Sequence, residues 1–233
     1  MLEQKYLTAK YGLAPFQNQA VTTSVSVAAD AQQTSLASVS AESQRKASIP
    51  PADGPLGLAE GLKIDEIEGM TGSTLTLVNQ EQNLYSTSTP PRPNSAFETI
   101  ALVISPTVGL CQIRALSKDI NTNSFGHQIQ SQYEEMRDAL NSVYGKGKTF
   151  DALMPGSLWK DSDEWMMGLY KKDRFLSTTW KSTPSAPLKS HVSMISMEAR
   201  ANSTSKAYYL VQYDFSNYSV CEAEEKNNKT GSL

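Results

Sequence analysis

Residues 124–145, SFGHQIQSQYEEMRDALNSVYG, form the sequence pattern that most limits the fold. Apolar side chains recur along it at i, i+4, i+7, i+11 and i+14, the spacing of one stripe on an amphipathic helix. The stripe consists of Ile129, Tyr133, Met136, Leu140 and Val143. Asn123 or Ser124 can cap the start of the helix, and Gly145 can end it. Such a helix must bury its apolar face against another element, so the rest of the chain has to supply one.

Segments with strand-like alternation lie on both sides of this helix. Two shorter helices are also expected, one near residues 58–69 and one over residues 161–172. The strand segments are 73–79, 97–105 and 110–120 before the long helix, and 174–180, 191–201 and 206–216 after it. Consecutive strands have short connections, and no regular strand–helix–strand repeat occurs, which favours antiparallel pairing. The pattern therefore predicts an α+β fold: an antiparallel sheet of five to seven strands with two or three helices packed on one face.

The composition changes sharply near residue 55. Residues 18–55 are dominated by Ser, Thr, Ala and Gln and contain no aromatic side chain, so they cannot bury enough apolar surface to offset the entropy of ordering. We therefore expect a flexible N-terminal tail over residues 1–55, one folded domain over residues 56–222, and a polar C-terminal tail over residues 223–233.

The charge balance excludes some classes of partner. The chain carries 21 basic and 24 acidic residues, a formal net charge of −3, which gives no general attraction to nucleic acid or to an anionic membrane. No apolar run approaches the ~20 residues of a membrane-spanning helix. The first residues also lack the apolar core of a secretion signal, so a cytoplasmic location is expected. The alternative is secretion without a cleavable signal peptide.

Two cysteines, Cys111 and Cys221, lie in or just beyond expected strands. Two buried thiols fit a reducing cytoplasm, and a disulfide between them is the alternative, because disulfides persist mainly in oxidising compartments. Together with the two histidines, the cysteines show no metal-ligand spacing. The sequence thus predicts neither a metal nor a cofactor.

All three tryptophans, Trp159, Trp165 and Trp180, fall within residues 156–180. One interpretation places them in the core and at its rim, where burying each indole contributes about 2–3 kcal/mol. The other makes them a binding groove, because Trp, Tyr and Met are enriched at binding surfaces. The core interpretation needs fewer assumptions.

Residues 142–149, SVYGKGKT, nearly match the phosphate-binding loop G-x-x-x-x-G-K-[ST]. Ser142 stands where the first glycine belongs, and the segment follows a helix instead of a strand. It is better explained as a helix end, with Gly145 as cap and Lys146 and Lys148 near the negative end of the helix dipole.

The strand RFLSTTW, residues 174–180, resembles the F-L-S-T-S strand of ADP-ribosyltransferases. In that family, a strand arginine holds the dinucleotide and a later glutamate supports transfer. Carried over by position, the resemblance implies Arg114, Ser177 and Glu198 as site residues. Ser196 stands where the family usually has Glu or Gln, and Thr179 replaces the last serine of the motif.

Residues 109–120, 125–146 and 150–169 resemble small uncharacterised bacterial α+β domains, and GLKIDEIEGM (61–70) is similar to a short helix of β-lactamase-inhibitor-like and SmpA/OmlA-like modules. Those modules pack helices on an antiparallel sheet and bind other proteins. No complete catalytic constellation is visible in the sequence. Our first hypothesis is therefore a non-enzymatic protein-binding module. The alternative is a secreted effector enzyme, a divergent ADP-ribosyltransferase.

Overall fold

A computed structural model describes residues 49–230. It shows one antiparallel sheet with the strand order β1-β2-β3-β4-β9-β8-β7-β6, and a short strand, β5, that pairs with β9. The strands before the long helix are β1 (Thr76–Asn79), β2 (Leu84–Thr87), β3 (Phe97–Ser105), β4 (Gly109–Ser117) and β5 (Ile120–Asn121). Those after it are β6 (Lys148–Leu153), β7 (Arg174–Lys181), β8 (Val192–Ser203) and β9 (Lys206–Phe215). The predicted α+β fold with an antiparallel sheet is confirmed, although the sheet contains more strands than expected.

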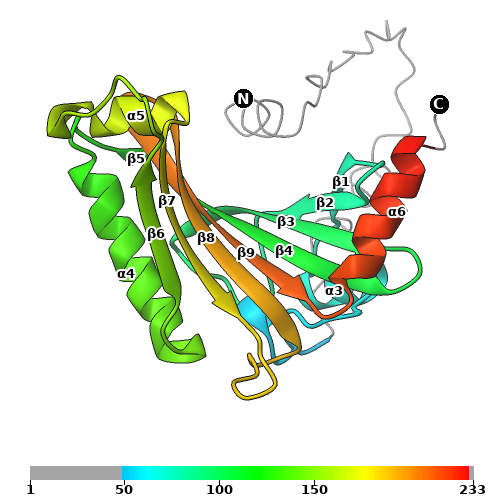
Figure 1. Ribbon diagram of the computed structural model, residues 1–233. Coiled ribbons are helices and arrows are strands. Elements are labelled where there is room, and N and C mark those ends of the chain that lie inside the picture. The colour runs from blue at the N-terminus through cyan, green and yellow to red at the C-terminus, as the bar shows by residue number, and fades with distance from the viewer. Residues whose placement is uncertain (1–48, 231–233) are drawn as a thin grey trace, which may run out of the picture.

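The helices of the described range are α3 (Ile64–Thr71), α4 (His127–Tyr144), α5 (Trp165–Lys171) and α6 (Tyr218–Thr230). Two 3₁₀ turns, η1 (Pro55–Gly57) and η2 (Ser162–Glu164), precede α3 and α5. The sheet curves strongly, with α4 beside the β6 end and α6 beside β3 and β4 (Figure 1). Most of the tail predicted over residues 1–55 lies outside the described residues.

The main core lies on one face of the sheet, which we call the core face. Strand side chains such as Ile113, Ile195 and Tyr209 pack there against α4 and α5, and α3 joins the same cluster through Ile67. The stripe predicted on α4 is buried at Ile129, Tyr133 and Leu140, whereas Val143 is exposed. Asn123, one of the two expected caps, contacts the start of the helix. Its Oδ1 accepts a hydrogen bond from the His127 backbone N–H at 3.1 Å.

The fourth helix, α6, lies against the opposite face of the sheet. Cys221 on α6 is bonded to Cys111 on β4, and both belong to a second apolar cluster with Ala101 and Val103. A β-bulge lets Cys111 reach α6. Ile104 pairs with Leu110 and Val103 with Gln112, so Cys111 is the extra residue of this bulge and has no partner on β3.

Three expectations are therefore corrected. Cys111 and Cys221 form a disulfide, whereas the sequence favoured two free thiols. The segment after residue 222, expected to be a polar C-terminal tail, forms most of α6, because the disulfide holds the start of this helix on the sheet. Helices cover both faces, whereas the sequence placed them on one.

Candidate functional site

The face opposite the core carries most of the polar side chains of the central strands, together with a small apolar cluster around Leu116 and Leu210, and we call it the polar face. The strand registers bring residues of β4, β9, β8 and β7 onto it side by side, because alternate residues of a strand point to opposite faces. Its members are Gln112, Arg114 and Leu116 on β4, Leu210, Gln212 and Asp214 on β9, Ser196, Glu198 and Arg200 on β8, and Phe175, Ser177, Thr179 and Lys181 on β7.

A buried hydrogen-bonded cluster occupies the part of this face nearest to α6. Asp214 Oδ1 accepts a hydrogen bond from Gln112 Nε2 at 2.6 Å and another from Gln212 Nε2 at 2.9 Å. Arg114 Nε donates to Gln112 Oε1. Burial raises the pKa of the Asp214 carboxyl, while the two amide donors and the Arg114 charge act in the opposite direction. Asp214 is therefore held as an acceptor inside a network, and no substrate has free access to it.

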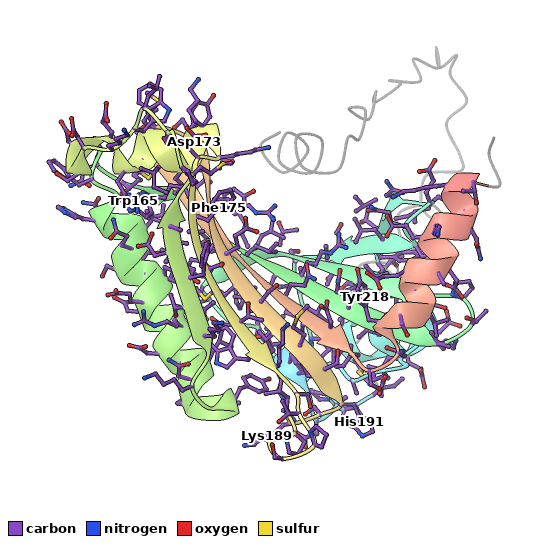
Figure 2. The ribbon with its side chains drawn as sticks, in the orientation of Figure 1. Trp165, Asp173, Phe175, Lys189, His191 and Tyr218 are labelled. Atoms are coloured by element: carbon purple, nitrogen blue, oxygen red, sulfur yellow. A yellow bond between two sulfur atoms is a disulfide. The ribbon has the colours of Figure 1, made fainter. Side chains whose placement is uncertain are left out.

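Tyr218, the first residue of α6 (Figure 2), is hydrogen-bonded to Gln112 of the same cluster. Burial raises the pKa of its phenol, and the Arg114 charge and a hydrogen bond with Gln112 oppose this rise. The start of α6 thus covers one end of the polar face with a neutral phenol.

The three residues implied by the ADP-ribosyltransferase resemblance share the polar face. Ser177 and Glu198 are direct cross-strand partners on β7 and β8. Arg114 lies two strands away, opposite Gln212, which in turn pairs with Ser196. Glu198 accepts a hydrogen bond from Arg200 Nη2 at 2.5 Å, and Arg114 donates to Gln112. The structure thus brings Ser177 and Glu198 together, but it draws the Arg114 side chain into the cluster beneath α6.

The other end of the polar face ends in an exposed strand. In residues 49–230, β6 pairs with β7 and with no other strand, so it forms an edge of the sheet. Phe150 on this strand is 56% exposed, and Phe175 on β7 is 37% exposed. Phe150 pairs with Ser177 and Ala152 with Phe175, which makes the two phenylalanines diagonal neighbours on the same face. Figure 2 shows Phe175 on β7. Two exposed aromatic rings therefore lie beside unpaired backbone groups.

The tryptophans are mostly interior. Trp165 and Trp180 are buried in the main core, and Trp180 Nε1 donates to Asn141 Oδ1 at 3.1 Å and to the Gly145 carbonyl at 2.9 Å. Trp159 is half-buried and lies in the loop between β6 and η2. Both buried indoles fit the core interpretation, because each is almost entirely covered by the rest of the fold.

No group of three or more His, Cys, Asp or Glu side chains in residues 49–230 is arranged to hold a metal ion. None of the helices in this range is both long enough and apolar enough to span a bilayer.

The chain matches no protein-family model, no curated protein and no solved structure. The resemblance to β-lactamase-inhibitor-like and SmpA/OmlA-like modules therefore stays a prediction.

Sequence reasoning missed the edge strand and its aromatic pair. The segment KTFDAL (148–153) does alternate, with Lys148, Phe150 and Ala152 on one side. This alternating segment is only six residues long. It overlaps GKGKT (145–149), whose glycines and lysines are typical of a helix end. A search for alternation in the short segment between the two helices could have found β6.

Proposed function

We propose that this chain is a non-enzymatic protein-binding module that receives an extended segment of another protein along β6. The observation that carries the proposal is the edge position of β6 together with the exposed rings of Phe150 and Phe175. An edge strand presents a row of free N–H and C=O groups, which an added strand can pair with, and neighbouring pockets or rings then select its side chains.

The bound segment would carry apolar side chains at every second position. Strand addition at β6 places alternate residues of the incoming segment on the polar face, where they would meet Phe150 and Phe175. Charged groups on the edge limit unselective pairing. Asp151 is held by Arg174 at 3.0 Å, so its charge is partly balanced, whereas Lys148 stays exposed. These charges favour selection of one segment over general aggregation.

The test compares three proteins in pull-downs from a native lysate: the unaltered chain, Phe150→Asn/Phe175→Asn, and the control Leu77→Asn. Leu77 is 42% exposed and lies on β1, at the opposite end of the sheet from β6. We expect a stoichiometric partner that the double variant loses and the control keeps. In the reconstituted complex, backbone amides of β6 should exchange hydrogen more slowly. Slower exchange elsewhere with β6 unchanged, or a partner retained by the double variant, would contradict the proposal.

We further propose that the protein works in an oxidising compartment, as in the secreted alternative. The support is the bond between Cys111 and Cys221, since disulfides in ordinary proteins persist mainly outside the reducing cytoplasm. Trapping of free thiols in the native source, followed by mass spectrometry, should recover these two cysteines unmodified. Recovery of both as alkylated thiols would count against an oxidising location.

The ADP-ribosyltransferase alternative has one favourable observation, the shared face of Arg114, Ser177 and Glu198. Two contacts oppose it: Glu198 is paired with Arg200, and Arg114 is engaged with Gln112. The alternative requires purified protein to consume NAD⁺ and Glu198→Ala to lose that consumption. The binding-module proposal expects no consumption by either protein.

A further inference from the structure

A second surface feature lies at the corner where α4 ends and β6 begins. A cavity of about 530 Å³ opens there, between the end of α4, the start of β6, the end of β7 and the loop that joins β7 to β8. Tyr144 and Trp180 belong to its wall, and Ala186 and Leu188 come from the loop. Lys189, labelled in Figure 2, belongs to the same loop.

Three lysines, Lys146, Lys148 and Lys181, line this cavity, and none of its lining residues is acidic. Within residues 49–230, Arg137, Arg174 and Arg200 each form an ion pair, whereas none of these three lysines does. Like charges gathered in one concave place raise the local positive potential and attract anions. The overall charge of the chain is negative, so this concentration of positive charge is a local property.

The end of α4 does not account for all three lysines. A helix C-terminus attracts positive charge because its last carbonyls lack partners. Here Trp180 Nε1 donates to the Gly145 carbonyl, and Asn141 Oδ1 accepts from the Gly147 backbone N–H. The chain thus satisfies groups at this helix end with its own neutral side chains. Lys181, on β7, is not part of the helix end.

The backbone that carries the lysines is held in place. A side chain at Gly147 would put its Cβ 2.5 Å from the Trp180 ring, so the loop between Lys146 and Lys148 lies directly on the indole. Lys148 is paired with Thr179 in the β6–β7 ladder, and Lys181 follows two residues later on the same face. The Thr179 hydroxyl makes no hydrogen bond to any described residue and is half-buried, so it can serve as an additional donor.

We infer that this lysine cavity binds a compact anion of the phosphate class that carries at least two negative charges. Lysine ammonium groups contact phosphate oxygens as point charges, and a hydroxyl adds direction. The site differs from a phosphate-binding loop, because SVYGKGKT follows a helix and does not open one. Here side chains from two neighbouring strands and a helix end would hold the anion, whereas a phosphate-binding loop uses a ring of backbone N–H groups.

The experiment titrates the ¹⁵N-labelled protein with pyrophosphate at constant ionic strength and follows backbone amide shifts. We expect saturable shifts confined to Lys146–Thr149 and Thr179–Lys181. Lys146→Gln/Lys181→Gln should weaken binding at least tenfold while leaving β6 intact. The control Lys160→Gln/Lys206→Gln removes the same charge from exposed lysines elsewhere and should bind as the unaltered chain does.

Three results would overturn the inference. They are shifts that do not saturate or that scatter over the surface, an equal loss in the control variant, and equal shifts with acetate at the same concentration. Because Phe150 and the β6 backbone are unchanged in the lysine variant, failure here leaves the strand-addition proposal untouched. Loss of partner binding in the phenylalanine variant likewise says nothing about pyrophosphate.

Discussion

At the scale of single residues, Gly126 fixes how α5 meets α4. This residue has φ 73°, a left-handed conformation, and it caps the start of α4. A Cβ at this position would lie 2.2 Å from Trp165 Cε3, so only glycine permits the indole to pack against the turn. The buried position of Trp165 thus depends on a residue that is adjacent in space and distant in sequence.

We expect Gly126→Ala to lower the free energy of unfolding by about 3 kcal/mol, from backbone strain and displacement of Trp165 combined. Gly156→Ala is the matched control. Gly156 has φ 85° and no atom within 4 Å of an added Cβ, so this change should cost only about 1 kcal/mol of strain. Urea unfolding followed by tryptophan fluorescence measures both. Equal losses in the two variants would mean that the contact with Trp165 contributes nothing.

At the scale of elements, α6 depends on a covalent link. The helix is mostly polar, and Cys221 is its buried residue. The disulfide to Cys111 spans 110 residues of sequence, and closing so long a loop restricts the unfolded chain. The stability of α6 therefore comes from the sheet to which it is bonded more than from its own sequence.

Reduction should destabilise the protein by about 2–4 kcal/mol, with hydrogen exchange rising first in α6. The measurement is urea unfolding with and without reductant, combined with exchange mass spectrometry. Cys111→Ala/Cys221→Ala should match the reduced protein and show no response to reductant. A midpoint in urea that reductant leaves unchanged in the unaltered chain would contradict this account.

The elements differ in how far sequence could predict them, for physical reasons. The stripe on α4 and the alternation in β7, β8 and β9 are long and regular, so periodicity was enough to find them. By contrast, β6 has only six residues, and four of them are exposed, so no run of buried apolar residues marked it as a strand in the sequence. The sequence of α6 is polar throughout its second half, and its place depends on a disulfide whose pairing the sequence left open.

At the scale of the whole molecule, one sheet serves two purposes. The core face holds α3, α4 and α5, and the polar face holds α6 at one end and the aromatic edge at the other. The predicted site residues Arg114, Ser177 and Glu198 do share a face, because strand alternation and the pairing register together place them there. Their hydrogen-bond partners come from tertiary contacts such as Gln112 with Asp214, which spacing along the chain cannot reveal.

Buried tyrosines should make the whole fold sensitive to alkali. Burial and the nearby Glu135 raise the pKa of Tyr209 to about 12, and burial also raises the pKa values of Tyr133 and Tyr213. Unfolded tyrosines lose their protons near pH 10, so between about pH 10 and 12 the folded chain binds more protons than the unfolded chain. Stability is therefore complete below pH 10 and falls as the pH rises through this window.

For Tyr209 alone, the expected loss by pH 12 is on the order of 2 kcal/mol. Urea unfolding at a series of pH values, with phenolate absorbance recorded in parallel, measures the effect. Tyr209→Phe should flatten the dependence, and Tyr170→Phe, at an exposed position on α5, should leave it unchanged. A stability that stays constant up to pH 12 would be the contrary result.

The bond between Cys111 and Cys221 also determines how the molecule would respond to a mechanical load. Pulling on the two ends of the chain transmits force to β4 and α6 through their sulfur atoms, which shields β5 to β9 and the helices between them. The 110 residues within this loop could otherwise extend by on the order of 370 Å. Stretched in an oxidising medium, the protein would release only the segments outside the loop, while the aromatic edge remained intact.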